Sequence, residues 1–228
     1  MPRRSYAQYC AVSRALDALG ERWTLLVVRE LLTGPRRYTD LHADLPGVST
    51  DVLASRLKEM ERDGIVERRR LAPPGAAYVY ELTDRGREIA PALAALARWG
   101  AAALGERRPT DALRGHWFAL PLMHRLEELA SGASGMLEVA LDEGAFRIRL
   151  GAAGDSGEGG DGGEGGGSAG GGAVTGAAAL VPDDGAKPDA RLLLDTASAV
   201  ALATGDALPS PAAVHGEGPL ADALRAAV

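Results

Sequence analysis

Apolar residues in the first third of the chain recur at steps of three and four positions, the spacing of one helix face. Two such stripes follow one another: Val12, Leu16 and Leu19, then Leu25, Val28 and Leu32. The pattern predicts two amphipathic helices, separated at Gly20 and Glu21. After the turn that carries Arg36 and Arg37, a short third helix is predicted over residues 38–45.

A fourth helix is predicted to begin after Ser49, whose hydroxyl suits a helix N-cap, and to end at Asp63 before Gly64. Its apolar stripe, Leu53, Leu57 and Met60, is expected to face the earlier helices. The opposite face is short and polar, and such side chains can hydrogen-bond base edges in a DNA major groove. This candidate recognition face comprises Asp51, Ser55, Lys58 and Arg62, flanked by Thr50 and Ala54.

Alternating residues then predict a two-stranded ribbon. Residues 65–70 form its first strand and end in Arg68, Arg69 and Arg70; residues 73–75 form the tip and 78–82 the return strand. Such a wing carries cations over the DNA backbone and the minor groove. A long last helix is predicted after Thr83, with a kink near Pro91.

The second half of the chain predicts an α+β domain whose strands meet in an antiparallel sheet. A helix over 113–129 precedes a hairpin of 136–141 and 145–150, followed by strands at 177–181 and 190–194. Thr196 is expected to cap a helix over 197–204 that Gly205 ends. A strand over 214–217 and a helix from Pro219 close the chain.

Length and composition predict two domains, residues 1–108 and 109–228, because 228 residues suit two units of about 100 residues each. The segment 151–176 holds 14 glycines and four acidic residues and is expected to be a disordered insert. A calcium site there is disfavoured because the regular aspartate-rich repeat is missing.

Charge is divided unevenly along the chain. Residues 1–110 carry 18 basic and 14 acidic side chains, a net charge of +4, whereas residues 111–228 carry 7 and 17, a net charge of −10. The first half is therefore the one suited to DNA phosphates. A single cysteine excludes an intrachain disulfide, and no apolar run approaches 18 residues. We expect a cytoplasmic protein with no membrane partner.

The segment from Tyr9 to Arg69, together with YVYELTDRGREI and Trp99, resembles the HxlR-type winged helix-turn-helix transcriptional regulators of bacteria. The resemblance implies a homodimer formed by the first and last helices and bound to a two-fold symmetric operator. It also implies that Arg37 lies near phosphate and that the helix after Ser49 enters the major groove. Asp51 departs from the basic or amide residue common in this family, so the sequence preference does not transfer.

The segments PDARLLLDTASAVALATGDALPSP and VHGEGPLADALR resemble sterol-carrier-protein-2-like domains. That resemblance implies a five-stranded sheet with helices over one face, enclosing an apolar cavity for a lipid-like ligand. The matching apolar positions are expected to line this cavity or to form plain core: Leu192, Leu194, Val200 and Leu202.

Three functions remain open. The first is a dimeric DNA-binding regulator modulated by a small apolar ligand in the second domain. The second keeps DNA binding but uses Cys10 as a redox sensor, since Arg3, Arg4 and Arg14 lie close in sequence and cations lower a thiol pKa. The third is a lipid-binding module without DNA function. The four histidines lack metal-ligand spacing, and neither a nucleophile motif nor a cofactor motif is present, so no enzyme, metal or cofactor is expected.

Overall fold

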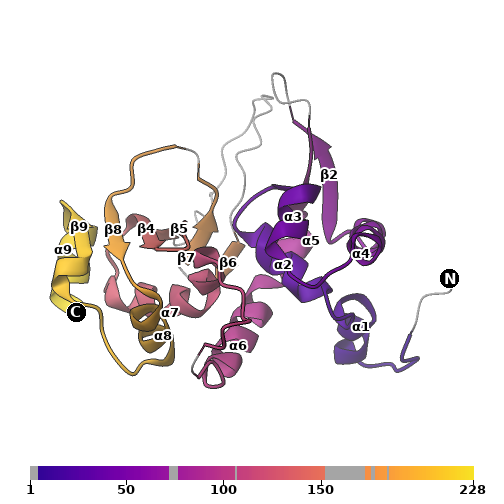
Figure 1. The fold of residues 1–228 in the computed structure, drawn as a ribbon, viewed down its shortest axis with the longest axis horizontal. Coiled ribbons are helices and arrows are strands. Elements are labelled where there is room, and N and C mark those ends of the chain that lie inside the picture. The colour runs from indigo at the N-terminus through magenta and orange to yellow at the C-terminus, as the bar shows by residue number, and fades with distance from the viewer. Residues whose placement is uncertain (1–4, 72–76, 106, 152–172, 176–177, 184) are drawn as a thin grey trace, which may run out of the picture. The chain divides into compact units, whose positions relative to one another are not determined.

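The computed structural model describes residues 5–71, 77–105, 107–151, 173–175, 178–183 and 185–228 (Figure 1). The chain divides into two compact units, residues 1–89 and 90–228, and each is described by itself below. Among the described residues, no helix combines the length and the apolar character that a membrane crossing requires.

The first unit is a winged helix. Its helices are α1 (Ala11–Leu19), α2 (Thr24–Leu32), α3 (Tyr38–Asp44), α4 (Thr50–Arg62) and the short α5 (Asp84–Arg87). Its strands are β1 (Arg36–Arg37), β2 (Val66–Arg70) and β3 (Tyr78–Leu82), which form an antiparallel sheet in the order β1-β3-β2. The predicted helix-turn-helix and ribbon are confirmed, while the predicted tip at residues 73–75 lies outside the described residues.

The core of this unit comes from the apolar stripes of α2 and α4. Leu53, Leu57 and Met60 are buried as their spacing predicts, and Val28 and Leu32 of α2 are buried as well. The stripe of α1 behaves differently. Val12 is 66% exposed and Leu16 is 45% exposed, so α1 presents an apolar face to solvent.

The predicted long last helix is wrong. It is two helices, α5 and then α6 (Ala90–Ala101), separated by a turn at Glu88 and Ile89. Pro91 has no N–H to donate to the carbonyl four residues earlier, but the second position of a new helix needs no such bond. The chain therefore begins a new helix at Ala90 in place of a kink. Thr83 still acts as a cap, accepting a hydrogen bond from the Gly86 amide at 3.1 Å.

The second unit combines a six-stranded sheet with helices. Its helical elements are α6, η1 (Gly115–Phe118), α7 (Ala119–Leu129), α8 (Thr196–Thr204), η2 (Pro211–Ala213) and α9 (Pro219–Ala227). Its strands are β4 (Gly135–Leu141), β5 (Gly144–Leu150), β6 (Ala173–Thr175), β7 (Ala178–Val181), β8 (Ala190–Leu193) and β9 (Val214–Gly216). They run in the order β6-β7-β5-β4-β8-β9.

The sheet of the second unit is mixed, which corrects the prediction of an antiparallel sheet. β4 and β8 pair in parallel, with Val139 opposite Leu192, while the other neighbouring strands are antiparallel. A tight turn forces two strands to be antiparallel, but β4 and β8 are joined by a long connection that leaves their direction free. Over the described residues the sheet has six strands, one more than the five implied by the sterol-carrier resemblance.

Two smaller corrections concern the ends of elements. Asp195, not Thr196, caps α8, because its carboxylate accepts a hydrogen bond from the Ser198 amide at 2.7 Å. Gly205 ends that helix in the left-handed region as predicted, with φ of 83°. Most of the insert predicted at 151–176 lies outside the described residues, but residues 173–175 near its end form β6.

Packing in the second unit places apolar residues on one face of the sheet. Leu137, Ile148 and Leu180 stand side by side on β4, β5 and β7 and are all buried. Helix α7 contacts β5 and β7, and α9 contacts β8 and β9. The neighbouring row on the opposite face is charged: Glu138 lies beside both Arg147 and Arg191.

Candidate nucleic-acid interface

Helix α4 is held in place at its first turn. The Ser49 hydroxyl accepts a hydrogen bond from the Val52 amide at 3.3 Å, as the sequence predicts for an N-cap. The Tyr38 hydroxyl, from α3, donates to the Thr50 carbonyl at 2.8 Å, a contact that links the two helices of the helix-turn-helix. The buried stripe of α4 fixes its rotation, so the opposite side is turned away from the core.

The N-cap Ser49 is exposed, and so are all residues of the candidate recognition face with its flanking positions: Thr50, Asp51, Ala54, Ser55, Lys58 and Arg62. Arg62 lies 3.5 Å from the Asp63 carboxylate, and the Ser55 hydroxyl is 3.5 Å from Glu59, too long for a strong hydrogen bond. Lys58 forms no ion pair with any residue that the structure describes. The face therefore presents the Lys58 ammonium group and short polar side chains, which can hydrogen-bond base edges.

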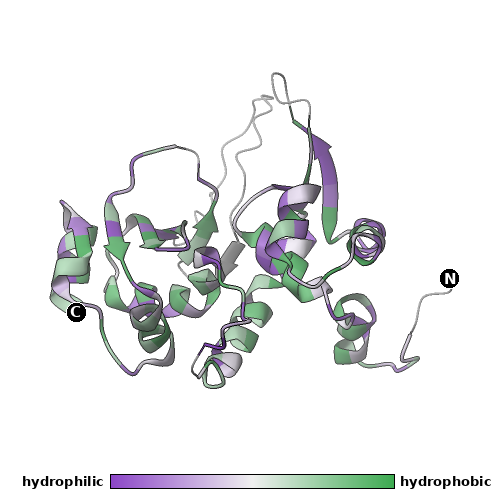
Figure 2. Cartoon of the chain, in the orientation of Figure 1, coloured by the Kyte–Doolittle hydropathy of each residue, from purple (hydrophilic) through white to green (hydrophobic). Residues whose placement is uncertain are grey.

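The three wing arginines have different surroundings. The Arg68 guanidinium lies over the ring of Tyr78, 4.0 Å from its centroid. Arg69 donates to both carboxylate oxygens of Glu81, at 2.5 and 3.2 Å, and this bond raises the pKa of its guanidinium. Arg70 is exposed and forms no ion pair within the described ranges. Figure 2 shows most of β2 in the hydrophilic colour.

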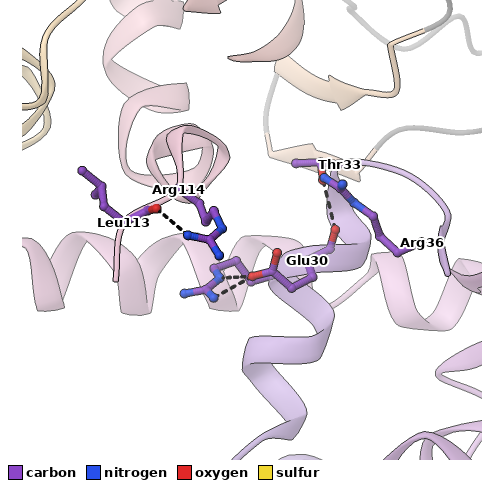
Figure 3. Close-up of polar contacts among 6 residues, drawn as sticks. Glu30, Thr33, Arg36, Leu113 and Arg114 are labelled. Carbon is purple, nitrogen blue, oxygen red and sulfur yellow. Dashed lines mark hydrogen bonds and ion pairs between the residues drawn. The ribbon is translucent and has the colours of Figure 1, made fainter. Parts of the chain in front are cut away.

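Strand β1 adds two cations beside the wing. Arg37 is exposed, and its backbone amide donates to Asp40 at 3.3 Å. Arg36 donates to the Thr33 hydroxyl at 3.1 Å, and that hydroxyl donates to the Glu30 carbonyl at 3.0 Å, at the end of α2 (Figure 3). Sequence reasoning missed β1, because two residues are too few to show alternation. It also missed the contacts of Tyr38 and Tyr78, which depend on the paired elements.

Cys10 precedes α1 and is exposed. The backbone amides of Ser13 and Val12, in the first turn of α1, lower the pKa of the thiol, as expected where a helix begins with unpaired N–H groups. Arg3 and Arg4, the cations named from the sequence, lie outside the described residues. The side chain of Arg14 is 3.6 Å from the Asp17 carboxylate.

The four residues expected to line a cavity belong to the second unit. Leu192, Leu194 and Leu202 are buried, and Val200 is half-buried. A surface hollow of about 530 Å³ in this unit is lined by other, mostly polar residues: Lys187, Pro188, Asp189, Gly216 and Glu217.

Comparisons with known proteins identify the winged helix. The model of the HxlR-like helix-turn-helix family matches residues 18–108. The uncharacterized HTH-type transcriptional regulator YvaP of Bacillus subtilis is 40% identical over 86 residues, covering 38% of this chain and 80% of that protein. The HTH-type transcriptional regulator YodB of the same species is 34% identical over 85 residues, 37% of this chain and 76% of YodB. Among solved structures, the oxidized redox regulator HypR aligns with 27% identity and a TM-score of 0.39, over 43% of this chain and 99% of HypR.

Proposed function

The chain belongs to the family of HxlR-like helix-turn-helix transcriptional regulators, and we propose that it binds a specific DNA operator as a homodimer. The observation that carries this proposal is the exposed polar face of α4, held at a fixed rotation by three buried residues on its other side. A bacterial regulator of this kind acts in the cytoplasm, where the DNA lies.

In the proposed complex, α4 enters the major groove and its outward residues contact base edges. Ser55 can donate or accept a hydrogen bond, and Lys58 can donate to guanine. Asp51 lies in the first turn of α4, where the helix dipole stabilises a carboxylate. The same negative charge repels DNA phosphate. Asp51 therefore suits a donor on a base, such as the cytosine amino group, better than it suits the backbone.

Backbone affinity is proposed to come from cations outside α4. The cations proposed for this role are the exposed Arg37 of β1 and Arg68 and Arg70 of the wing, and residues 1–110 carry a net charge of +4. Contacts of this kind fix the protein on the duplex without reading its sequence, and they weaken as salt rises.

The proposed roles are tested by binding to an operator and to random DNA of the same length. Ser55→Ala and Lys58→Ala are expected to lower operator affinity about 5- to 150-fold and to reduce the preference over random DNA, because a good base contact contributes about 1–3 kcal/mol. Arg85→Ala, an exposed arginine of α5 outside the proposed interface, is the matched control. An unchanged preference in both α4 variants would refute base reading by this face.

The homodimer is supported by the apolar surface of α1. Tyr9 is fully exposed, and Val12 and Leu16 continue an uncovered stripe. On α6, Leu96 and Trp99 are also exposed. Burying such side chains in a second copy would remove apolar area from water. Sedimentation of the full chain is expected to give a dimer, and Leu16→Glu is expected to give a monomer; a monomeric parent protein would refute the dimer.

We propose that the second unit, with its sterol-carrier resemblance over residues 188–225, responds to a small apolar ligand. The half-buried Val200 on α8, near the buried Ala199 and Leu202, supports an entry beside that helix. A fluorescent fatty acid is the probe: saturable binding that changes operator affinity supports ligand control. Saturable binding by a protein that shows no affinity for DNA would favour the alternative of a lipid-binding module.

A second candidate function is thiol-based sensing. It is favoured by the exposed Cys10 thiol and its lowered pKa, because the thiolate is the form that reacts with oxidants. In this alternative the second unit is structural. Peroxide is then expected to change operator affinity in the parent protein and to leave Cys10→Ser unaffected; an equal response of both proteins would refute it.

A further inference from the structure

The geometry of the wing assigns different roles to its three arginines, and this inference rests on the proposed DNA-binding function. We propose that Arg68 and Arg70 contact DNA phosphates, that Arg69 does not, and that Tyr78 is a positioning residue that holds Arg68 ready for its contact. Three consecutive arginines in the sequence give no basis for assigning them different roles.

Arg69 is neutralised within the protein. Its Nε and one terminal nitrogen donate to the two carboxylate oxygens of Glu81, a two-bond arrangement that is stronger than a single-point contact. The side chain of Glu81 is 16% exposed, so the carboxylate is partly shielded from water. A DNA phosphate would have to displace this partner to bind the same guanidinium edge.

Among the residues that the structure describes, none forms a hydrogen bond or ion pair with the Arg68 guanidinium. Its Cζ lies over the ring of Tyr78, 4.0 Å from the centroid, a separation that a guanidinium reaches when its flat face rests on the ring. The N–H donors of an arginine lie in the guanidinium plane and point outward from its rim. Stacking therefore restricts the conformations of the side chain without occupying its donors, which lowers the entropy cost when phosphate binds.

Strand alternation separates the two kinds of contact. Arg68 lies opposite Tyr80 and Arg70 lies opposite Tyr78, so these four side chains share one face of the ribbon. Glu67 lies opposite Glu81, and their face also carries Arg69. Over the described parts of β2 and β3, one face thus carries two cations and two tyrosines, while the other carries one cation and two carboxylates. The cationic face is the one suited to DNA.

Two double variants test this division at constant net charge. Arg69→Gln with Glu81→Gln removes the internal pair; Arg70→Gln with Glu67→Gln, the matched control, removes one cation from the DNA-facing side and one carboxylate from the other. Binding of the full chain to a random duplex is measured by fluorescence anisotropy at several salt concentrations. The readout is the slope of log affinity against log salt, which changes by about 0.9 for each phosphate that the protein no longer neutralises.

The proposal predicts an unchanged slope for the Arg69 pair and a slope shallower by about 0.9 per bound protomer for the Arg70 pair. Arg68→Gln is expected to resemble the Arg70 pair. Tyr78→Leu is expected to weaken binding to the duplex. Tyr78→Phe, which keeps the ring face, is expected to bind as tightly as the parent protein. Unfolding midpoints equal to that of the parent protein exclude a folding defect as the cause.

The result that overturns the assignment is a shallower slope for the Arg69 pair, or no difference between Tyr78→Leu and Tyr78→Phe. Failure of the proposed function looks different: the parent protein itself would show no salt-dependent affinity for duplex DNA, and both proposals would fall together.

Discussion

The Tyr38 hydroxyl of α3 donates to the backbone carbonyl of Thr50, the first residue of α4, at 2.8 Å. This bond joins the two helices of the helix-turn-helix directly where α4 begins. It complements the Ser49 cap, which satisfies an amide in the same turn. The orientation of the exposed α4 face thus depends on side chains outside that face.

Tyr38→Phe removes this bond while keeping the ring. The free energy of unfolding is expected to fall by about 0.5–1.5 kcal/mol, the usual net contribution of one hydrogen bond. Urea unfolding provides the measurement. Tyr6→Phe is the control, because the Tyr6 side chain is exposed and its hydroxyl forms no hydrogen bond with any described residue, so its loss should have no effect. Equal stability of the two variants would show that the bond contributes nothing.

Ser49→Ala separates stability from DNA contact. Loss of the N-cap is expected to lower the free energy of unfolding by about 1 kcal/mol. Ser55→Ala, on the exposed face of the same helix, is expected to leave stability nearly unchanged and to lower operator affinity. Thermal unfolding of both variants checks the first effect. A destabilised Ser55→Ala with an unaffected Ser49→Ala would contradict these assignments.

The Cys10 thiol is expected to react with iodoacetamide at lower pH in the folded protein than in the urea-unfolded chain. The amides of Ser13 and Val12 stabilise the thiolate and lower its pKa in the fold. This shift favours folding above the thiol pKa of the unfolded chain, and its contribution is lost as pH falls through the folded-state value. With one cysteine, labelling reports this site alone. Coincident pH profiles for the two states would contradict the shift.

The charged row in the second unit predicts a large stability effect. Arg147 donates to Glu138 at 3.1 and 3.2 Å and lies 2.8 Å from Asp183, while the side chains of Glu138 and Arg147 are only 11% and 9% exposed. Glu138→Ala is expected to cost about 1.5–3 kcal/mol, because the buried Arg147 loses two charged hydrogen bonds and keeps the exposed Asp183. Arg149→Ala, at an exposed position on the same strand as Arg147, should cost far less. Urea unfolding distinguishes the two, and similar losses would count against the buried pair.

Local patterns predicted the winged helix well because each signal acts within a few residues. The spacing of Leu53, Leu57 and Met60 predicts the buried side of α4, and Ser49 marks its start. Pro91 indicated that the helix is interrupted, but not whether it bends or ends. In both cases the proline lacks the N–H that would bond to the carbonyl four residues earlier.

Contacts between distant segments could not be predicted in the same way. The parallel pairing of β4 with β8 joins strands about 50 residues apart, so no turn chemistry fixes their direction. The separate roles of Arg68 and Arg69 depend on which residues of β3 stand opposite them. Likewise, the exposed stripe of α1 has the spacing of a buried one, and a single chain shows no partner for it among the described residues.

The most direct test of DNA recognition is a titration of the full chain on its own upstream promoter and on random DNA of equal length, at two salt concentrations. We expect tighter binding to the promoter, with both affinities falling as salt rises. Equal affinity for the two sequences, or no binding to either, would contradict the claim that this chain is a sequence-specific regulator.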